Sequence, residues 1–316
     1  MEPNKELTTE PVVTDYCGPS PVGDYLSEYL GELGDGTRRY LGLETGIHPL
    51  DEAMSGISGL IVLGGQSGCG KTTLALNVAY ETAKKGTPVI IYSLEMSKLN
   101  LLTKIFNKLT KISYRGILLG KKKIEQEYIN RFKTDVGSTL YIMSSGTGDK
   151  KISLTKLESD IEYVKVKHKA KEVLVIVDHL QIFPLDVTKK DENYRDQIDK
   201  EQKLIIGFRE IKERTGACIV LISQLSKAKY DSRGSMSIKG SVGIVYQAEI
   251  VMILIRPFWE AGNKSDPSFT LIVDKNRYGP NPVFKGSIFG DESNVVFDGN
   301  NIYMEPTEAV LNFDPS

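Results

Sequence analysis

The chain has 316 residues, of which 40% are hydrophobic and 26% are charged, an ordinary balance for a folded globular protein. Its net charge of −1, from 40 basic and 41 acidic residues, excludes a strong overall field that would attract a polyanion, so any such site is a local patch. The polar N-terminus and the lack of a long apolar run exclude a signal peptide and a membrane span. The cysteines Cys17, Cys69 and Cys218 are odd in number and far apart, so we expect no disulfide framework and a cytoplasmic protein.

The first 40 residues differ in character from the rest. Residues 1–21 are polar and without periodicity, which predicts a flexible arm. Residues 22–33 place apolar side chains at helical spacing and predict a short amphipathic helix, which packs either on its own domain or on a neighbouring subunit. We therefore expect an N-terminal extension over 1–40, one domain over 41–300, and a C-terminal tail over 301–316.

From residue 60 onward, apolar runs rich in β-branched residues alternate with helical patterns. The expected strands cover residues 60–63, 88–93, 139–143, 173–178, 218–224, 250–255 and 269–273, and the expected helices cover 73–80, 98–109, 128–133, 154–171 and 199–214. Unbroken apolar runs joined through helices predict an α/β fold whose mostly parallel central sheet is covered on both faces. The last strands follow one another closely, which predicts antiparallel additions at one edge.

Residues 65–72 carry the pattern G-x-x-x-x-G-K-T between an expected strand and an expected helix, the context of a P-loop. Glycines let backbone N–H groups approach phosphate oxygens, and the helix N-terminus adds positive partial charge. We expect Lys71 to reach the β- and γ-phosphates of ATP and the Thr72 hydroxyl to bind Mg²⁺. The expected nucleotide-binding set is Gly65, Ser67, Gly68, Cys69, Gly70, Lys71, Thr72, Thr73 and Asp178.

Polar side chains follow three of the expected strands, at the end where ligands collect in open α/β sheets. Asp178 ends the run 173–177 and suits a metal-supporting carboxylate. Glu95 follows the strand over 88–93 and could orient the attacking water. Gln224 ends the strand over 218–223 and could sense the γ-phosphate. By position alone each has an ordinary alternative: a polar strand end or, for Glu95, an acid in the first turn of a helix.

Two later segments are basic. Residues 226–241 predict a long Gly/Ser-rich loop, and four of its side chains suit a nucleic-acid backbone: Lys227, Lys229, Arg233 and Lys239. Residues 275–280 predict a turn on which Lys275 and Arg277 point to the same side, from which an arginine could reach a phosphate of its own chain or a neighbour. In isolation, a solvated loop and a solvated turn are the simpler interpretations.

Together these motifs resemble one family. The order of the P-loop, Ser93-Leu94-Glu95-Met96, Asp178-His179-Leu180-Gln181 and a K-x-R-x-G-P turn at 275–280 resembles the motor domain of DnaB-type hexameric replicative DNA helicases, which have a RecA-like P-loop NTPase fold. The resemblance covers about residues 40–298. The S-L-E-M stretch is its most specific part, because RecA-like ATPases in general seldom carry it.

The resemblance implies roles that the residues alone leave open. It implies that Glu95 activates water and that Asp178 supports Mg²⁺. Gln224 would couple the nucleotide to DNA loops that follow it and Gln181. Lys275 and Arg277 would reach the γ-phosphate of the adjacent subunit, with Arg277 as the arginine finger. It further implies a homohexamer around single-stranded DNA, 5′–3′ travel, and possible primase and helicase-loader partners.

Three departures from the family pattern stand out. Only residues 1–39 stand where bacterial members carry a large N-terminal domain, which suggests a compact phage-like or plasmid-like version acting in a host cytoplasm. Residues 238–249 follow the family's L-R-E-S-G-S-I-E-Q-D-A-D loosely, with Gly240 and Val245 where acids are usual. His179 replaces a tyrosine, and from this exchange we expect the smallest effect.

The leading hypothesis is therefore an ATP-dependent ring helicase that unwinds duplex DNA during replication. The alternative is a RecA-like DNA-dependent ATPase that acts as a recombination mediator or strand-exchange protein, which would need the P-loop, Asp178 and Gln224 but not the S-L-E-M stretch. A third possibility is a nucleotide-gated assembly module without catalysis, and Glu95 argues against it because such a module has no use for a water-positioning carboxylate.

Overall fold

The computed structural model describes residues 21–27, 30, 40–144, 152–185, 197–230, 236–238, 246–256, 262–263 and 265–303. The chain divides into two units, Met1–Arg39 and Tyr40–Ser316, and each is described by itself. In the first unit a 3-10 helix, η1 (Val22–Tyr25), lies at the start of the expected amphipathic helix, with Leu26 and Leu30 exposed. Residues 1–20 and most of 28–39 lie outside the described residues.

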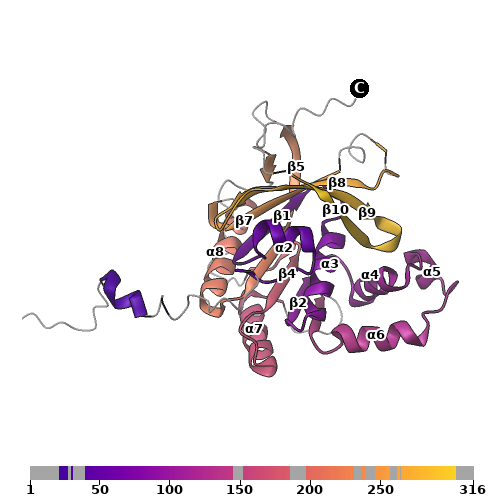
Figure 1. The fold of residues 1–316 in the computed structure, drawn as a ribbon, viewed down its shortest axis with the longest axis horizontal. Coiled ribbons are helices and arrows are strands. Elements are labelled where there is room, and N and C mark those ends of the chain that lie inside the picture. The colour runs from indigo at the N-terminus through magenta and orange to yellow at the C-terminus, as the bar shows by residue number, and fades with distance from the viewer. Residues whose placement is uncertain are drawn as a thin grey trace, which may run out of the picture. The chain divides into compact units, whose positions relative to one another are not determined.

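The second unit is built on a ten-stranded sheet (Figure 1). Its strands are β1 (Leu60–Gly65), β2 (Val89–Ser93), β3 (Leu140–Ser144), β4 (Leu174–Asp178), β5 (Cys218–Tyr230), β6 (Met236–Ile238), β7 (Ile250–Ile255), β8 (Ser268–Asn276), β9 (Val283–Phe289) and β10 (Asn294–Tyr303). They follow the order β10-β9-β8-β7-β1-β5-β4-β2-β3, and β6 pairs with β5. Pairing is parallel from β7 to β3 and antiparallel from β7 through β10, so the expected sheet is confirmed.

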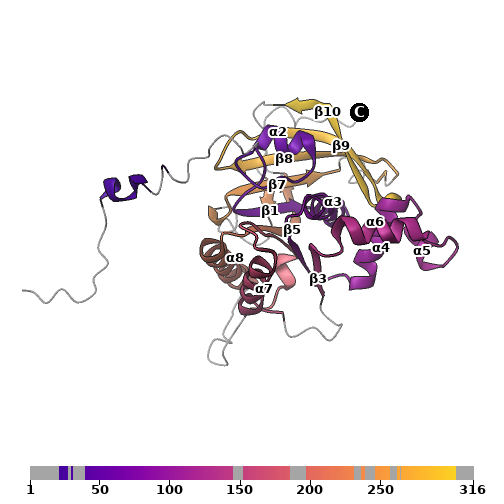
Figure 2. The same ribbon diagram turned by 60° about the horizontal axis from the view of Figure 1, so that its bottom comes forward.

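The described helices of this unit are α2 (His48–Met54), α3 (Lys71–Lys84), α4 (Lys98–Thr110), α5 (Tyr114–Leu118), α6 (Gln126–Val136), α7 (Leu154–His168) and α8 (Gln197–Thr215), with 3-10 helices η2 (Leu180–Ile182) and η3 (Gly290–Glu292). Of these, α3 covers one face of the parallel part, and α7 and α8 cover the other (Figure 2). Alternate residues of a strand point to opposite faces. Ile61 and Leu63 accordingly join the core under α3, whereas Leu60 and Val62 join the core under α7 and α8. None of the described helices has both the length and the apolar character needed to cross a membrane.

The structure differs from the sequence-based expectation in a few places. The loop expected over 226–241 is in part a β-hairpin, because β5 runs on to Tyr230 and pairs antiparallel with β6. Pairing with β6 satisfies backbone groups that a loop would leave to water, and the Gly/Ser-rich composition concealed it. Lys275 lies within β8 rather than in a turn, and α2 was not predicted.

The register of the parallel strands decides which residues meet at the carboxyl edge of the sheet. Gly65 at the end of β1 pairs with Gln224 on β5, and Asp178 at the end of β4 pairs with Ser93 on β2. Parallel strands end at the same edge, so the P-loop, Glu95, Asp178 and Gln224 all come together there.

Candidate active site

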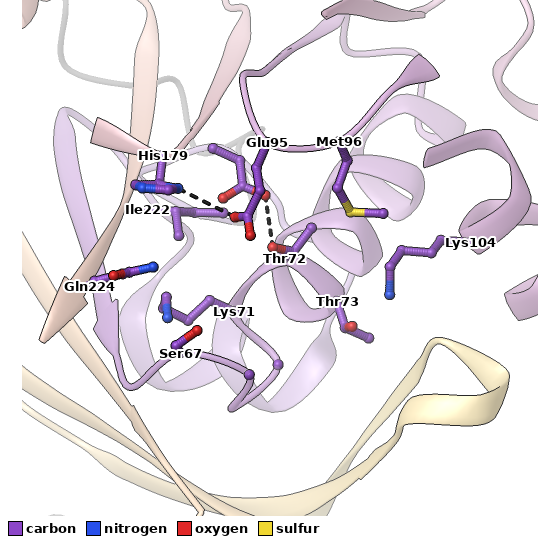
Figure 3. A pocket seen from close by; sticks show the side chains of 13 residues that line it. Ser67, Lys71, Thr72, Thr73, Glu95, Met96, Lys104, His179, Ile222 and Gln224 are labelled. Atoms are coloured by element: carbon purple, nitrogen blue, oxygen red, sulfur yellow. Dashed lines mark hydrogen bonds and ion pairs between the residues drawn. The ribbon is translucent and has the colours of Figure 1, made fainter. Parts of the chain in front are cut away.

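A pocket opens at this carboxyl edge, between the P-loop, the start of α3 and the ends of β2, β4 and β5 (Figure 3). Within the part of the chain that the structure describes, it is lined by Ser67, Gly68, Gly70, Lys71, Thr72, Thr73, Glu95, Met96, Lys104, Asp178, His179, Ile222 and Gln224. Three of the candidate catalytic residues, Lys71, Glu95 and Gln224, therefore share one cavity with most of the expected nucleotide-binding set. Gly65 and Cys69 belong to the loop but do not line the pocket, and Cys69 is fully buried.

The P-loop depends on glycine at two of its positions. Gly68 and Gly70 have φ of 79° and 105°, a region that residues with a Cβ rarely adopt. A Cβ on Gly70 would also lie 2.8 Å from Cδ1 of Ile288 on β9. Gly70 is the N-cap of α3, and its carbonyl accepts the first helical bond from the Leu74 N–H at 2.9 Å. The loop thus delivers backbone N–H groups and a helix N-terminus to the pocket, a setting that favours phosphate.

Lys71 and Thr72, the first two residues of α3, point into the pocket (Figure 3). The ammonium of Lys71 donates hydrogen bonds to the carbonyl oxygens of Gly65 (2.8 Å) and Gln66 (2.7 Å). The hydroxyl of Thr72 donates to Oδ2 of Asp178 at 2.7 Å. This last bond ties the start of α3 to the end of β4 and places two oxygen ligands side by side.

Asp178 is almost completely buried, with 3% of its surface exposed. Burial raises the pKa of this carboxyl, the hydrogen bond from Thr72 opposes the rise, and the negative charge of Glu95 adds to it. A cation would relieve the cost of this buried charge. The Thr72–Asp178 oxygen pair fits Mg²⁺, which prefers oxygen ligands.

Glu95 sits in the turn between β2 and α4, with 59% of its side chain exposed. Its Oε2 lies 3.4 Å from Nδ1 of His179, the residue after Asp178. Ligand atoms of Glu95, Asp178 and His179 all lie within 4.8 Å of one another, close enough to share a metal ion. Two carboxylates and an imidazole therefore face the space in front of Lys71.

Gln224 lines the pocket at the point where β5 leaves the main sheet toward its hairpin with β6. Its backbone N–H donates to Oε1 of Gln181 at 3.4 Å. The amide of Gln181 in turn donates to the hydroxyl of Ser223 at 2.8 Å. The strand that carries Gln224 thus leads directly from the pocket into the basic segment.

Lys104 is a pocket residue that the sequence analysis missed. It lies on α4, which begins after the N-cap Ser97 and follows Glu95 closely in the chain. Its side chain extends toward the pocket (Figure 3), burial lowers the pKa of its ammonium, and the charge of Asp178 opposes that shift. The sequence feature that could have indicated this residue is its position between Leu101 and Ile105, which lie on the buried side of the helix. Lys104 adds a second ammonium to the pocket.

The remaining candidates lie elsewhere. Lys275 donates from Nζ to the carbonyl oxygen of Ala248 (2.7 Å), and Arg277 donates from Nη2 to that of Tyr246 (2.9 Å), away from the pocket of their own chain. Lys227 and Lys229 lie on β5, but their side chains are not described. Arg233 and Lys239 lie outside the described residues.

Comparison with known proteins identifies the family. The family model of the DnaB-like helicase C terminal domain matches residues 42–289. The chain belongs to this family. Among curated relatives, the replicative DNA helicase DnaB of Rickettsia typhi is 24% identical over 255 residues, which cover 74% of this chain and 50% of the relative. DnaB of Geobacillus stearothermophilus is 26% identical over 251 residues, covering 76% and 53%. The chain thus spans about half the length of these curated relatives.

Solved structures confirm the fold of this DnaB-family chain. An ATPase domain matches with a TM-score of 0.73 at 19% identity and covers 88% of this chain and 99% of its own. A DnaB-like replicative helicase, solved in a study of its interactions with primase, matches with a TM-score of 0.71 at 20% identity, covering 88% and 67%. A KaiC-like protein from Pyrococcus horikoshii matches with a TM-score of 0.52 at 16% identity, covering 81% and 97%. The expected RecA-like P-loop fold is therefore confirmed.

Proposed function

We propose that this chain is the motor of an ATP-driven, ring-shaped DNA helicase that moves along single-stranded DNA and unwinds duplex DNA during replication. One observation carries the proposal. A single pocket joins the P-loop lysine Lys71, the buried Asp178 and the exposed Glu95 in a chain of the DnaB-like helicase family. Binding, charge neutralisation and water activation are the three tasks of phosphoryl transfer to water.

Each task falls to residues of the pocket. The P-loop N–H groups and Lys71 bind the β- and γ-phosphates of ATP, and the Lys104 ammonium adds positive charge beside them. Thr72 and Asp178 hold Mg²⁺, which neutralises charge on the phosphate oxygens. Glu95 orients the attacking water and accepts its proton. Gln224 couples the presence of the γ-phosphate to the chain segment that follows it, in which Lys227, Lys229, Arg233 and Lys239 bind DNA.

The ring and its partners form the second part of the proposal. Six copies form a homohexamer around single-stranded DNA, and Lys275 and Arg277 of each copy complete the pocket of the next. The curated relatives are replicative helicases, and a structural neighbour was studied for its interactions with primase, so primase and a helicase loader are the partners to test. We assign the protein to the cytoplasm, with 5′–3′ travel, on the strength of the family.

Two assays on the full chain test the proposal. ATP hydrolysis is measured with and without single-stranded DNA, alongside unwinding of a forked duplex. We expect DNA to stimulate hydrolysis and the fork to open only with ATP. DNA-stimulated hydrolysis without unwinding would contradict the helicase assignment. It would support the recombination mediator, the alternative that the comparisons do not favour. Absence of hydrolysis would leave only an assembly module.

Lys104→Ala tests the second ammonium of the pocket. A hydrogen bond to a charged group contributes roughly 1.5–3 kcal/mol. We therefore expect the KM for ATP to rise by about 10-fold or more, with a smaller loss for Lys104→Arg, which keeps the charge. Lys98→Ala, on the first turn of the same helix but outside the pocket lining, is the matched control. An unchanged KM in Lys104→Ala would remove this residue from the phosphate site.

A further inference from the structure

The ends of β2 and β4 are hydrogen-bonded to each other directly beside the pocket. Ser93 pairs with Asp178 in the parallel register, and the N–H of Leu94 donates to the carbonyl oxygen of Asp178 at 2.8 Å. Glu95, two positions after the end of β2, and His179, directly after the end of β4, both project into the pocket (Figure 3). The strand pairing thus decides that these two side chains face each other.

The two partners differ in how firmly they are held. The side chain of His179 is 12% exposed, whereas that of Glu95 is 59% exposed. His179 leads into η2, where Leu180 is fully buried and the Ile182 N–H donates to the His179 carbonyl oxygen at 3.3 Å. Glu95 lies on an open turn, and a glutamate has more rotatable side-chain bonds than a histidine. The firmly held imidazole is therefore suited to limit the motion of the exposed carboxylate.

The contact gives the exposed Glu95 carboxylate a polar partner inside the pocket. A carboxylate on an open turn without such a partner is drawn toward solvent, where its hydration is favourable. The Nδ1 of His179, 3.4 Å from Oε2, offers a donor that draws the carboxylate back.

We propose that His179 is a positioning residue that holds the Glu95 carboxylate over the attacking water. This inference rests on the proposed hydrolysis of ATP. In this role Nδ1–H would donate a hydrogen bond to Oε2, from which Nδ1 lies 3.4 Å away, and Oε1 would accept a hydrogen bond from the water. In the step, the water oxygen bonds to the γ-phosphorus and its proton passes to Glu95. The bond from the γ-phosphorus to the bridging oxygen breaks, and ADP keeps that oxygen.

The proposed role gives a physical reason for histidine in place of tyrosine at this position. In the family pattern D-Y-L-Q the residue after the aspartate is tyrosine, whose hydroxyl stands farther from the backbone than Nδ1 of an imidazole. A positioning role for His179 predicts a larger effect of this exchange than the sequence analysis expects.

Three substitutions test the role of the ring nitrogen. His179→Ala removes the donor, His179→Asn places an amide N–H near the position of Nδ1, and His179→Gln places one near that of Nε2. A misplacement of about 1 Å costs on the order of 10²-fold in rate. We expect kcat for ATP hydrolysis to fall about 10²-fold in His179→Ala and His179→Gln and to recover substantially in His179→Asn. His48→Ala, at an exposed histidine on α2, is the control.

Binding measurements separate positioning from a structural role. Affinity for a non-hydrolysable ATP analogue, the Mg²⁺ concentration for half-maximal rate and Tm should stay near the wild-type values in all three variants. In a Glu95→Ala background, His179→Ala should lower the residual kcat no further, because the two residues act as a unit.

Other results would overturn the inference in distinguishable ways. Equal kcat in His179→Ala and wild type would reject positioning while leaving the helicase proposal intact. A raised Mg²⁺ requirement would mean that His179 acts on the metal. A matching loss of kcat in Asn and Ala variants with lowered Tm would mean a packing role. Absence of hydrolysis in the wild type would reject both proposals together.

Discussion

Glu95→Gln is expected to lower kcat for ATP hydrolysis by about 10²–10⁴-fold, the usual contribution of a positioned general base. Glutamine keeps the size of the side chain and can still accept a hydrogen bond from water. It cannot take the proton that the water loses when it attacks phosphorus. Glu95 is 59% exposed, so the substitution leaves the packing of the site undisturbed.

The measurement pairs steady-state hydrolysis with binding of a fluorescent ATP analogue. Binding should remain within about two-fold of wild type, because Lys71 and the P-loop glycines are intact. Glu127→Gln, an exposed acid in the first turn of α6, is the matched control and should hydrolyse ATP at the wild-type rate. If Glu95→Gln also kept the wild-type kcat, another group would have to activate the water. His179 would then have no catalytic carboxylate to position.

The parallel sheet and the pocket residues on its carboxyl edge were predictable, because both follow from patterns that are local in the sequence. Each buried strand is a continuous apolar run, and parallel strands necessarily end at a common edge. A residue directly after such a run, such as Asp178 or Gln224, therefore falls at that edge whatever the strand order.

What could not be predicted depends on pairing between distant segments. Glu95 meets His179 because β2 lies next to β4, and nothing in either segment specifies that neighbour. The hairpin of β5 and β6 likewise depends on a partner strand beyond a Gly/Ser-rich stretch. Lys104 enters the pocket through the orientation of α4, which packing against the sheet decides. Sequence patterns therefore predict the strands and the edge at which they end, but not the side-chain contacts between distant elements.

The position of Arg277 has a geometric consequence for its proposed role. On the antiparallel pair, Asn276 of β8 lies opposite Ile250 of β7, and Ile250 pairs with Ile61 near the amino end of β1. The P-loop starts at Gly65, at the other end of β1. At about 3.3 Å per residue, the two levels lie about 13 Å apart along the strand. Arg277 thus lies toward the edge opposite to its own pocket, which favours action on a neighbouring subunit.

Arg277→Ala is accordingly expected to lower kcat by about 10³-fold or more, the range measured for arginine fingers. The oligomeric state by light scattering should match that of the wild type, and the affinity for a non-hydrolysable analogue should change little. Arg214→Ala, which removes an exposed arginine paired with Glu158 on α7, is the control for a lost surface charge. A loss of hydrolysis that merely follows dissociation of the ring would count against a finger.

Mixing two inactive variants decides whether the finger acts between subunits. Lys71→Ala destroys the phosphate site but keeps the finger, and Arg277→Ala keeps the phosphate site but lacks the finger. In rings assembled from equal amounts, about a quarter of the interfaces pair an intact phosphate site with an intact finger. Hydrolysis should therefore return on mixing, although neither variant hydrolyses ATP alone. If both functions belonged to one chain, no mixture could restore them, because every subunit would carry one defect.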